Sequence, residues 1–465
     1  MTVSVSFLGA ARNVTGSRHL FEADGVRVLV DAGLYQERQN AAHNWEDFAV
    51  APSELDAVIL THAHIDHAGW LPRLVRLGYR GLVYCSRATA EIAPIVLFDA
   101  QRLQAEDVEW KRKRHEREGR TSIFPIEALY EEEDVEATQQ ALSGQEFGHR
   151  VEVAKGVTAT FYPSGHILGA SMVLLEHAAS GKRVLFSGDL GRKGRPLMPD
   201  PWDPPEADLV VVESTYGDRL HDDSEDVTTQ LEHVIRRTIK RRGTLLIPCF
   251  AVERAQELLY HLQRLRRGGR IASVPIFLDS PMAVSLLNVF RHHPEALDEL
   301  SRDRLAHGDS PFSLPELKLC SSRDDSKRIN ELEGPAIIIA GSGMCNGGRI
   351  KHHLNRHLSR EDSTLLFVGY QASGTLGRLL LDGASEVRLF NQYLPVNLEV
   401  AQIQGFSGHA DRNELLDWLG RMPNGPKHVA VVHGGSSVTE RFAQDVRSRF
   451  GCAVAAPSFR DCVEV

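Results

Sequence analysis

The segment THAHIDHAG at residues 61–69 carries four side chains of the types that bind divalent metal ions. His62 and His64 lie two residues apart on an extended segment, so both imidazoles project to the same side. Asp66 and His67 follow where the segment turns into a helix. Imidazole and carboxylate groups are the ligands that borderline and hard divalent cations prefer. The spacing therefore predicts a metal site, because an isolated surface or core histidine would not share one short loop with three other side chains that bind metals.

The elements around this loop are those of an α/β unit. A buried strand is expected at Ala57 to Leu60, and a helix with apolar residues at helical spacing follows the loop. Earlier β-type runs include HLFEAD and VRVLVDAG, which form a predicted hairpin around a D-G turn. Residues 89–142 are expected to be helical and highly charged, and the run KRKRHEREGR is interpreted as a solvated face, with RNA contact as the lesser alternative. Strands return at VEVAKGVTATFYPSG, SMVLLEHAASGKRVLFSGD and ADLVVVEST.

A second domain is predicted from about residue 208, where strands begin to alternate with long helices. Such alternation is typical of a parallel-sheet α/β domain. After Leu394 the run VNLEVAQIQGFSGHAD resumes β-type alternation, and no Pro/Gly/Ser-rich linker separates the parts. We therefore expect a first domain in two parts, residues 1–207 and 395–465, with residues 208–394 inserted between them.

The composition of the 465 residues, 42% hydrophobic and 25% charged, is sufficient for two or three domains with their own cores. The net charge of −9 argues against a uniformly basic surface that coats nucleic acid, although a local basic groove is compatible with it. No apolar run approaches the ~20 residues of a membrane span, and no secretory signal begins the chain, so a cytoplasmic protein is expected. The six cysteines form no C-x-x-C pair, which argues against a disulfide framework and a thiolate zinc site.

The H-x-H-x-D-H motif of residues 62–67 resembles the signature of the metallo-β-lactamase superfamily. The resemblance implies an αββα sandwich with two metal ions at the edge of its sheets and three further ligands downstream. Matching motifs occur in YPSGHILGA, LFSGDLG and VAVVHGG. In the implied assignment one ion is bound by His62, His64 and His166, the other by Asp66, His67 and His433, and Asp189 bridges both. Two zinc ions per chain are the implied cofactors, with manganese as the alternative in a site that contains carboxylates.

The long segment between Asp189 and His433 resembles the insertion of the β-CASP nucleases, in which a lid domain covers the metal cleft. Glu213 in VVVESTYGDR and His409 in GFSGHAD match two hallmark motifs of that family. His433 matches the third, and a histidine there is typical of members that act on RNA rather than of the DNA-repair branch. The chain is most similar to bacterial and archaeal RNA-processing members and to the eukaryotic messenger-RNA 3′-end-cleaving endonuclease. We expect no further RNA-binding module at either end.

The implied activity is that of a zinc-dependent ribonuclease, in which metal-bound hydroxide attacks the phosphodiester and leaves 5′-phosphate and 3′-hydroxyl ends. His409 is the expected general acid, and Glu213 is expected to hold its ring and raise its pKa. Asp411 is a weaker candidate partner of His409. The metal-binding carboxylates Asp66 and Asp189 complete the predicted catalytic set. Internal cleavage is favoured, and removal of nucleotides from a 5′ end is kept as the alternative.

Two glycine-rich segments in the expected insertion could bind phosphate groups, AGSGMCNGGRIKHHL at 340–354 and GYQASGTLGRLL at 369–380. Each follows an apolar strand and precedes a helical pattern, so backbone N–H groups could face anionic oxygens. The predicted RNA contacts are Ser342, Ser373, Gly374, Thr375 and Arg378. Tight turns are the alternative explanation for the glycines. His352 and His353 are equally compatible with phosphate contact and with a helix surface.

Two other functions stay open at the level of sequence. The first is a hydrolase of the same fold that acts on a small ester or thioester, for which the insertion has no evident purpose. The second is a non-catalytic subunit of an RNA-processing complex, against which the complete ligand set argues. RNA is the predicted partner, no membrane association is expected, and a homodimer is compatible with the sequence.

Overall fold

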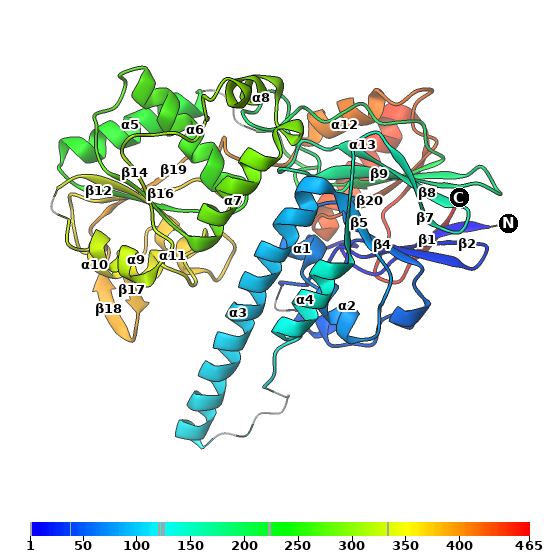
Figure 1. The fold of residues 1–465 in the computed structure, drawn as a ribbon, viewed down its shortest axis with the longest axis horizontal. Coiled ribbons are helices and arrows are strands. Elements are labelled where there is room, and N and C mark those ends of the chain that lie inside the picture. Colours follow the sequence, from blue (N-terminus) through cyan, green and yellow to red (C-terminus); the bar gives the residue numbers. More distant parts are fainter. Residues whose placement is uncertain (1, 38, 120, 122–125, 222–224, 333) are drawn as a thin grey trace. The chain divides into compact units, whose positions relative to one another are not determined.

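The computed structural model describes residues 2–37, 39–119, 121, 126–221, 225–332 and 334–465 (Figure 1). These residues form two compact units. Unit 1 consists of Met1–Leu220 and Gly408–Val465, and unit 2 consists of His221–Ser407. Unit 2 is therefore a single insertion into the chain of unit 1. Among the described residues, no helix has both the length and the apolar character needed to cross a membrane.

Unit 1 contains two seven-stranded sheets. The first has the order β22 (Cys462–Glu464), β1 (Val3–Phe7), β2 (His19–Ala23), β3 (Val26–Val30), β4 (Ala57–Ile59), β5 (Val83–Ser86) and β6 (Leu142–Gln145). The second has the order β21 (Ala453–Ala455), β20 (His428–Val432), β11 (Leu209–Glu213), β10 (Arg183–Phe186), β9 (Ser171–His177), β8 (Val157–Pro163) and β7 (Arg150–Ala154). Strands β3 to β6 pair in parallel, as do β10, β11, β20 and β21.

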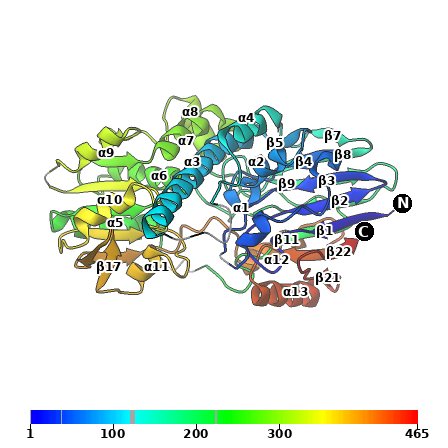
Figure 2. The ribbon, with the colours of Figure 1, turned by 90° about the horizontal axis from the view of Figure 1, so that it is seen from below.

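Burial on both faces of the central strands explains the layers of unit 1. In β11, Leu209 and Val211 join a core that both sheets share, whereas Val210 and Val212 join a second core. This alternation follows from the period of two along a strand. The second core also contains side chains of α12 (Arg412–Gly420) and α13 (Ser436–Phe450), which cover the outer face of the second sheet (Figures 1 and 2).

The remaining helices of unit 1 lie beside the first sheet, and together the layers make the αββα sandwich that the sequence predicts. They are α1 (Ile65–Ala68), α2 (Leu71–Arg76), α3 (Arg87–Glu118) and α4 (Glu132–Ala141), with short 3-10 turns at Ala41–Asn44 and Pro52–Glu54. Helix α3 starts where the Ser86 side chain accepts a hydrogen bond from the backbone N–H of Thr89, and it ends at Gly119 in a left-handed conformation. Helices α3 and α4 occupy most of residues 89–142, the segment expected to be helical, whereas residues 126–131 between them are not helical.

Unit 2 has a six-stranded parallel sheet of order β14 (Leu317–Leu319), β13 (Ile276–Asp279), β15 (Ala336–Ala340), β12 (Thr244–Pro248), β16 (Thr364–Phe367) and β19 (Glu399–Gln402). The central strands are fully buried, as is usual where crossover helices cover both faces. Its helices are α5 (Val227–Lys240), α6 (Arg254–Arg267), α7 (Pro281–His292), α8 (Glu299–Ala306), α9 (Arg323–Ile329), α10 (Ile350–His357) and α11 (Leu376–Leu381), with a 3-10 turn at Pro294–Ala296. A separate hairpin consists of β17 (Glu386–Leu389) and β18 (Gln392–Pro395).

Both boundaries of the insertion fall later in the chain than the predicted 208 and 394. Strand β11 pairs with β10 and β20, so it belongs to unit 1 although it opens the run of strands and helices. Strand β19 pairs with β16, so the alternating segment after Leu394 still belongs to unit 2. The periodicity of a sequence predicts that a strand forms but does not predict which sheet it joins. The predicted boundaries therefore differ from those of the structure.

Candidate metal centre

The side chains predicted as metal ligands gather at one edge of the sandwich of unit 1. They follow strands β4, β8, β10 and β20 in the two sheets, and the carboxyl ends of parallel neighbours lie at the same edge. Gly188, with φ +52°, lets the segment after β10 pass close to the segment after β4. A Cβ atom there would lie only 2.9 Å from the Cβ of Thr61. The seven residues are His62, His64, Asp66, His67, His166, Asp189 and His433.

Four of these residues form the first cluster, His62, His64, His166 and Asp189. The Nε2 atom of His62 and the Nε2 atom of His166 lie 3.1 and 3.2 Å from Nδ1 of His64. Both Nε2 atoms also lie near Oδ2 of Asp189, at 3.4 and 3.5 Å. Three nitrogens and one carboxylate oxygen therefore face a common point.

The second cluster contains Asp66, His67 and His433, and the other oxygen of Asp189 faces it. The Nε2 atoms of His67 and His433 are 3.1 Å apart. Oδ1 of Asp189 lies 3.2 Å from Nε2 of His67, and Oδ2 of Asp66 lies 3.5 Å from Nε2 of His433. Asp189 thus presents one oxygen to each cluster, as the bridging assignment requires.

These separations fit metal ligation. Ligands bound tetrahedrally at ~2.05 Å from zinc are separated by roughly 3.3 Å, close to the spacings in both clusters. Oδ1 of Asp189 is also buried without a hydrogen-bond donor, which is costly for a carboxylate unless a cation compensates it. The donor set of imidazoles and carboxylates suits zinc, and it also admits manganese.

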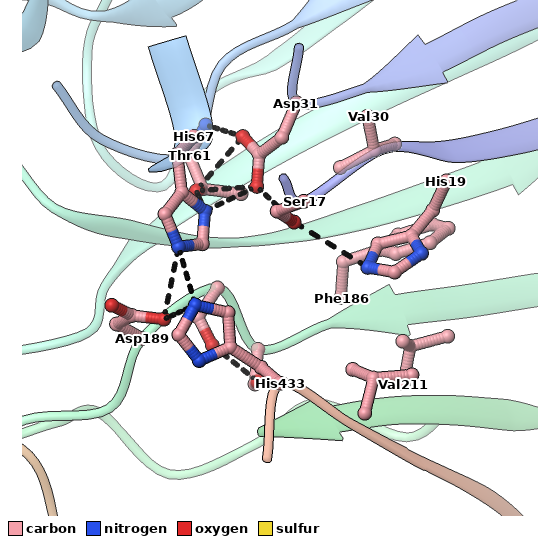
Figure 3. A pocket seen from close by; sticks show the side chains of 13 residues that line it. Ser17, His19, Val30, Asp31, Thr61, His67, Phe186, Asp189, Val211 and His433 are labelled. Carbon is pink, nitrogen blue, oxygen red and sulfur yellow. Dashed lines mark hydrogen bonds and ion pairs between the residues drawn. The ribbon is translucent and has the colours of Figure 1, made fainter. Parts of the chain in front are cut away.

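The nitrogens that face away from the clusters are held by other protein groups. Nδ1 of His67 lies 2.7 Å from Oδ2 of Asp31 (Figure 3). Nδ1 of His433 lies 3.0 Å from Oγ1 of Thr215. Nδ1 of His166 lies 3.2 Å from the carbonyl oxygen of Gly408. Such outer partners fix the ring orientation and direct the inner lone pair toward a metal.

Sequence reasoning missed Asp31, which is central to this support. Asp31 follows the buried strand β3 and also accepts hydrogen bonds from the backbone N–H and the hydroxyl of Thr61, at 2.8 and 3.0 Å. Its φ of +62° and the +51° of His433 are left-handed values that non-glycine residues adopt mainly at sites of strain. The sequence signal was available, because Asp31 ends a strand next to the predicted strand that precedes His62.

The pKa values of the clustered histidines move in opposite directions. Burial lowers the pKa of His64 to about 3 and that of His166 well below its usual value, so both rings are neutral at pH 7. For His67, burial lowers the pKa, but the carboxylates of Asp189 and Asp31 outweigh this and raise it well above 6.5. A histidine must be neutral to ligate a metal, so binding at the second cluster competes with a proton.

Glu213 and His409 lie next to the clusters. Nδ1 of His409 is 3.2 Å from Oε2 of Glu213, whose Oε1 accepts a 2.6 Å hydrogen bond from the backbone N–H of Leu190. Burial lowers the pKa of His409, but the carboxylates of Glu213 and Asp189 outweigh it and raise the pKa to about 9. Asp411, the weaker candidate, instead caps α12 by accepting hydrogen bonds from the N–H groups of Asn413 and Glu414.

A small cavity of about 20 Å³ lies behind the clusters, between the two sheets (Figure 3). Asp31, His67, Asp189 and His433 line part of it, and the rest of the lining mixes apolar side chains with His19 and the hydroxyl residues Ser17, Thr61 and Ser187. A volume of this size holds about one water molecule. The cavity is therefore too small for a substrate.

The predicted phosphate-binding residues all lie in unit 2, where the two glycine-rich segments contact each other. The backbone N–H of Gly377 donates to the carbonyl of Met344 at 3.0 Å. Ser373, Gly374 and Arg378 are exposed, but Arg378 forms an ion pair with Asp382 at 2.6 Å. Each of the others makes local contacts within these loops. Thr375 caps α11, and the Ser342 hydroxyl contacts Gly347.

Comparison with known proteins identifies this arrangement. Residues 16–242 match the model of the metallo-β-lactamase superfamily, residues 255–380 match the β-CASP domain, and residues 393–457 match the zinc-dependent metallo-hydrolase RNA specificity domain. The chain belongs to the metallo-β-lactamase superfamily. It is a β-CASP RNA-processing metallonuclease, an enzyme of the zinc-dependent ribonuclease family, and the predicted family and fold class are confirmed.

Individual relatives cover most of the chain. It is 39% identical over 426 residues to ribonuclease TTHA0252 of Thermus thermophilus, with 92% of each chain covered. It is 32% identical over 475 residues to the transcription termination factor FttA of Methanocaldococcus jannaschii, covering all of this chain and 72% of that one. A crystal structure of a protein of unknown function from Enterococcus faecalis matches the full length of both chains, with a TM-score of 0.54 and 13% identity, which supports the fold alone.

Proposed function

We propose that this protein hydrolyses RNA phosphodiester bonds with two divalent metal ions per chain, zinc in the first place, and leaves 5′-phosphate and 3′-hydroxyl ends. One observation carries the proposal: the two oxygens of Asp189 face two separate histidine clusters, each with the spacing of a tetrahedral ligand set. The RNA specificity domain and the name of the Thermus relative support RNA as the substrate.

The chemistry divides between the bound ions and the chain. When bound, the ions supply activation of water near neutral pH and stabilisation of charge on the phosphoryl oxygens. His409 protonates the departing ribose 3′ oxygen, and the proton comes from Nε2 because Nδ1 engages Glu213. Glu213 keeps the ring oriented and favours its protonated form. The carboxylates of Glu213 and Asp189 outweigh burial and raise the pKa of His409 to about 9, so its ring holds a proton near neutral pH.

Internal cleavage is the proposed mode, and removal of nucleotides from the 5′ end is the alternative. The resemblance of the chain to the messenger-RNA 3′-end-cleaving endonuclease supports this choice. A singly 5′-labelled RNA, incubated beside the equivalent DNA, separates the two modes. Internal fragments would support the endonuclease and labelled mononucleotides the exonuclease. Cleavage of DNA alone would contradict the RNA assignment, and a chelator should abolish all cleavage.

Substitution of His409 tests the general acid. His409→Ala should reduce kcat by roughly 10²- to 10⁴-fold while leaving the metal content per chain unchanged, because His409 is outside both ligand clusters. Metal content by elemental analysis and single-turnover cleavage of the labelled RNA measure the two effects. Asp411→Asn is the matched control, since asparagine also caps a helix and should preserve turnover. Parallel loss of metal and turnover in His409→Ala would contradict the assigned role.

A further inference from the structure

The hairpin of unit 2 contains an aromatic side chain at an unfavourable backbone position. Leu389 pairs with Gln392, so β17 and β18 are joined by a two-residue turn, Phe390–Asn391. The φ values of these residues are +47° and +66°. Asparagine and glycine are the usual residues of such turns, whereas a bulky side chain with positive φ is strained. The turn itself therefore does not explain why a phenyl ring is present.

The ring of Phe390 packs on the first turn of α10 while staying 48% exposed. It stacks on His352, with ring centroids 5.0 Å apart and planes inclined by 26°. The ammonium group of Lys351 lies 5.3 Å from its centroid, within the range of a cation–π interaction. Figure 1 shows the hairpin projecting from unit 2 beside α10, and Figure 2 shows β17 beside α11. His352, for which sequence left two roles open, is thus part of an aromatic stack.

Next to this stack, the outer face of the hairpin carries Tyr393 and Arg388, which pair across the two strands. Tyr393 is 68% exposed, more than any other large apolar or aromatic side chain among the described residues. The alternate residues Val387 and Leu389 are buried against the core of unit 2. We name Lys351, His352, Arg388, Phe390 and Tyr393 the hairpin platform.

The charge around the platform is predominantly basic. Helix α10 has the sequence IKHHLNRH and carries no acidic residue, and its Lys351, His352 and Arg356 are at least partly exposed. Glu386 is the one acidic side chain of the two hairpin strands. Exposed rings separated by cationic groups suit a single nucleic-acid strand, because bases stack on the rings while phosphates meet the cations. A protein partner would instead favour a continuous apolar patch with few charges at its centre.

The platform is continuous with the predicted phosphate-binding loops. Helix α11 packs against β17, and its backbone is bonded to the first glycine-rich segment through Leu376 N–H and the side-chain oxygen of Asn346, at 2.9 Å. Tyr370, 64% exposed, lies in the second glycine-rich segment. A strand held by the loops therefore has further aromatic and cationic contacts within the same unit.

We propose that the hairpin platform binds unpaired bases of single-stranded RNA, with Phe390 and Tyr393 as the stacking rings and Lys351 and Arg388 as phosphate contacts. The inference rests on RNA being the substrate, and it adds a binding surface that the metal clusters do not include. Duplex RNA cannot use the platform, because the faces of its bases are already stacked.

Binding is tested with the full-length protein and a fluorescent single-stranded RNA of 20 nucleotides, with chelator present so that nothing is cleaved. Phe390→Gly and Tyr393→Leu should each weaken binding about tenfold, the loss expected for one stacked base. Phe390→Gly also relieves the positive φ, so its melting temperature should be unchanged or higher. Tyr393→Phe should bind like the wild type. The matched control is Leu300→Ala on α8, which removes a 60% exposed side chain of the same unit.

The outcomes separate this proposal from the proposed function. The platform is supported if Phe390→Gly and Tyr393→Leu bind single-stranded RNA more weakly than the wild type but bind duplex RNA equally well. This holds even if the wild type fails to cleave RNA. Unchanged affinity in both variants overturns the platform while leaving the ribonuclease assignment intact. If both variants bind RNA normally but lose a dimer seen by sedimentation, the hairpin is a contact between copies and the proposal is wrong.

Discussion

Asp189 in unit 1 and Asp279 in unit 2 are both buried beside histidine, and the two sites differ in how the carboxylate oxygens are satisfied. In unit 2, Oδ1 of Asp279 accepts a 2.6 Å hydrogen bond from Arg349, and Oδ2 accepts from His353 at 2.7 Å and Ser326 at 2.6 Å. In unit 1, Oδ1 of Asp189 has no hydrogen-bond donor. A buried carboxylate whose donors are complete stabilises the fold, whereas a buried carboxylate oxygen that lacks a donor and faces imidazole nitrogens suits a bound cation. The comparison distinguishes a structural cluster from a ligand site by hydrogen bonds alone.

Asp189→Asn should reduce catalysis more than any other substitution proposed for these two sites. The amide removes the charge shared by the two clusters, so cleavage of RNA should fall by about 10³-fold or more, with loss of bound metal. Elemental analysis and the cleavage assay measure this, and Asp279→Asn is the matched substitution in unit 2. The contrast between the sites fails if Asp279→Asn, once folded, loses metal as Asp189→Asn does.

Asp279→Asn should instead reduce stability. One partner of a buried ion pair is lost and Arg349 and His353 remain, so the free energy of unfolding should decrease by about 3 kcal/mol. Hydrogen exchange of peptides from β13 and α10 in the full chain reports this locally. Unchanged protection there would show that the cluster contributes little to unit 2.

The stability that Asp279 contributes should be lost at acid pH, when its carboxylate is protonated. Burial raises the pKa of Asp279, but hydrogen bonds from His353, Ser326 and Arg349 outweigh it and lower the pKa below its ordinary value of 3.8. A lowered pKa means that the stability is complete above the ordinary value and is lost as pH falls below it toward the native value. Asp279→Asn should remove this part of the acid dependence of protection in β13.

Substitution of Asp31, a third buried carboxylate, should have a smaller effect than substitution of Asp189. The oxygens of Asp31 are satisfied, as in Asp279, but one partner is the metal-cluster residue His67. Asp31→Asn keeps the size and weakens the acceptor, so metal affinity should fall roughly 10- to 100-fold. Competition with a chelator of known affinity measures this. A normal affinity would mean that His67 needs no help from Asp31 to keep its orientation.

The sequence alone predicts the metal ligands that lie close together along the chain, but it does not predict contacts between residues that lie far apart along the chain. His62, His64, Asp66 and His67 occur in one loop, so their types and spacing alone predicted a metal site. The ligands on other strands required the family resemblance, and the structure brings them to the same edge.

For Asp31 and Asp279 the sequence shows an acidic residue at the end of a strand but does not show its partners, because those partners lie far along the chain. Asp31 contacts a residue 36 positions away, and Asp279 contacts one 74 positions away. Each is a single acidic residue at the end of an apolar strand. Only the packing of the elements shows that one supports a metal cluster and the other stabilises a helix against a strand.

The ends of the insertion are fastened together within unit 1. The chain leaves that unit after Leu220 and returns at Gly408, and before the departure Tyr216 forms a parallel bridge with Asp411. The backbone N–H of Arg412 also donates to the carbonyl of Arg219 at 3.2 Å. The two ends of the inserted segment are thus held together by contacts within unit 1, whatever residues the insertion contains. The entropic cost of closing such a loop grows only slowly with the length of the loop. The insertion can therefore gain or exchange segments during evolution without a change in the relative position of Glu213 and His409, which precede and follow it.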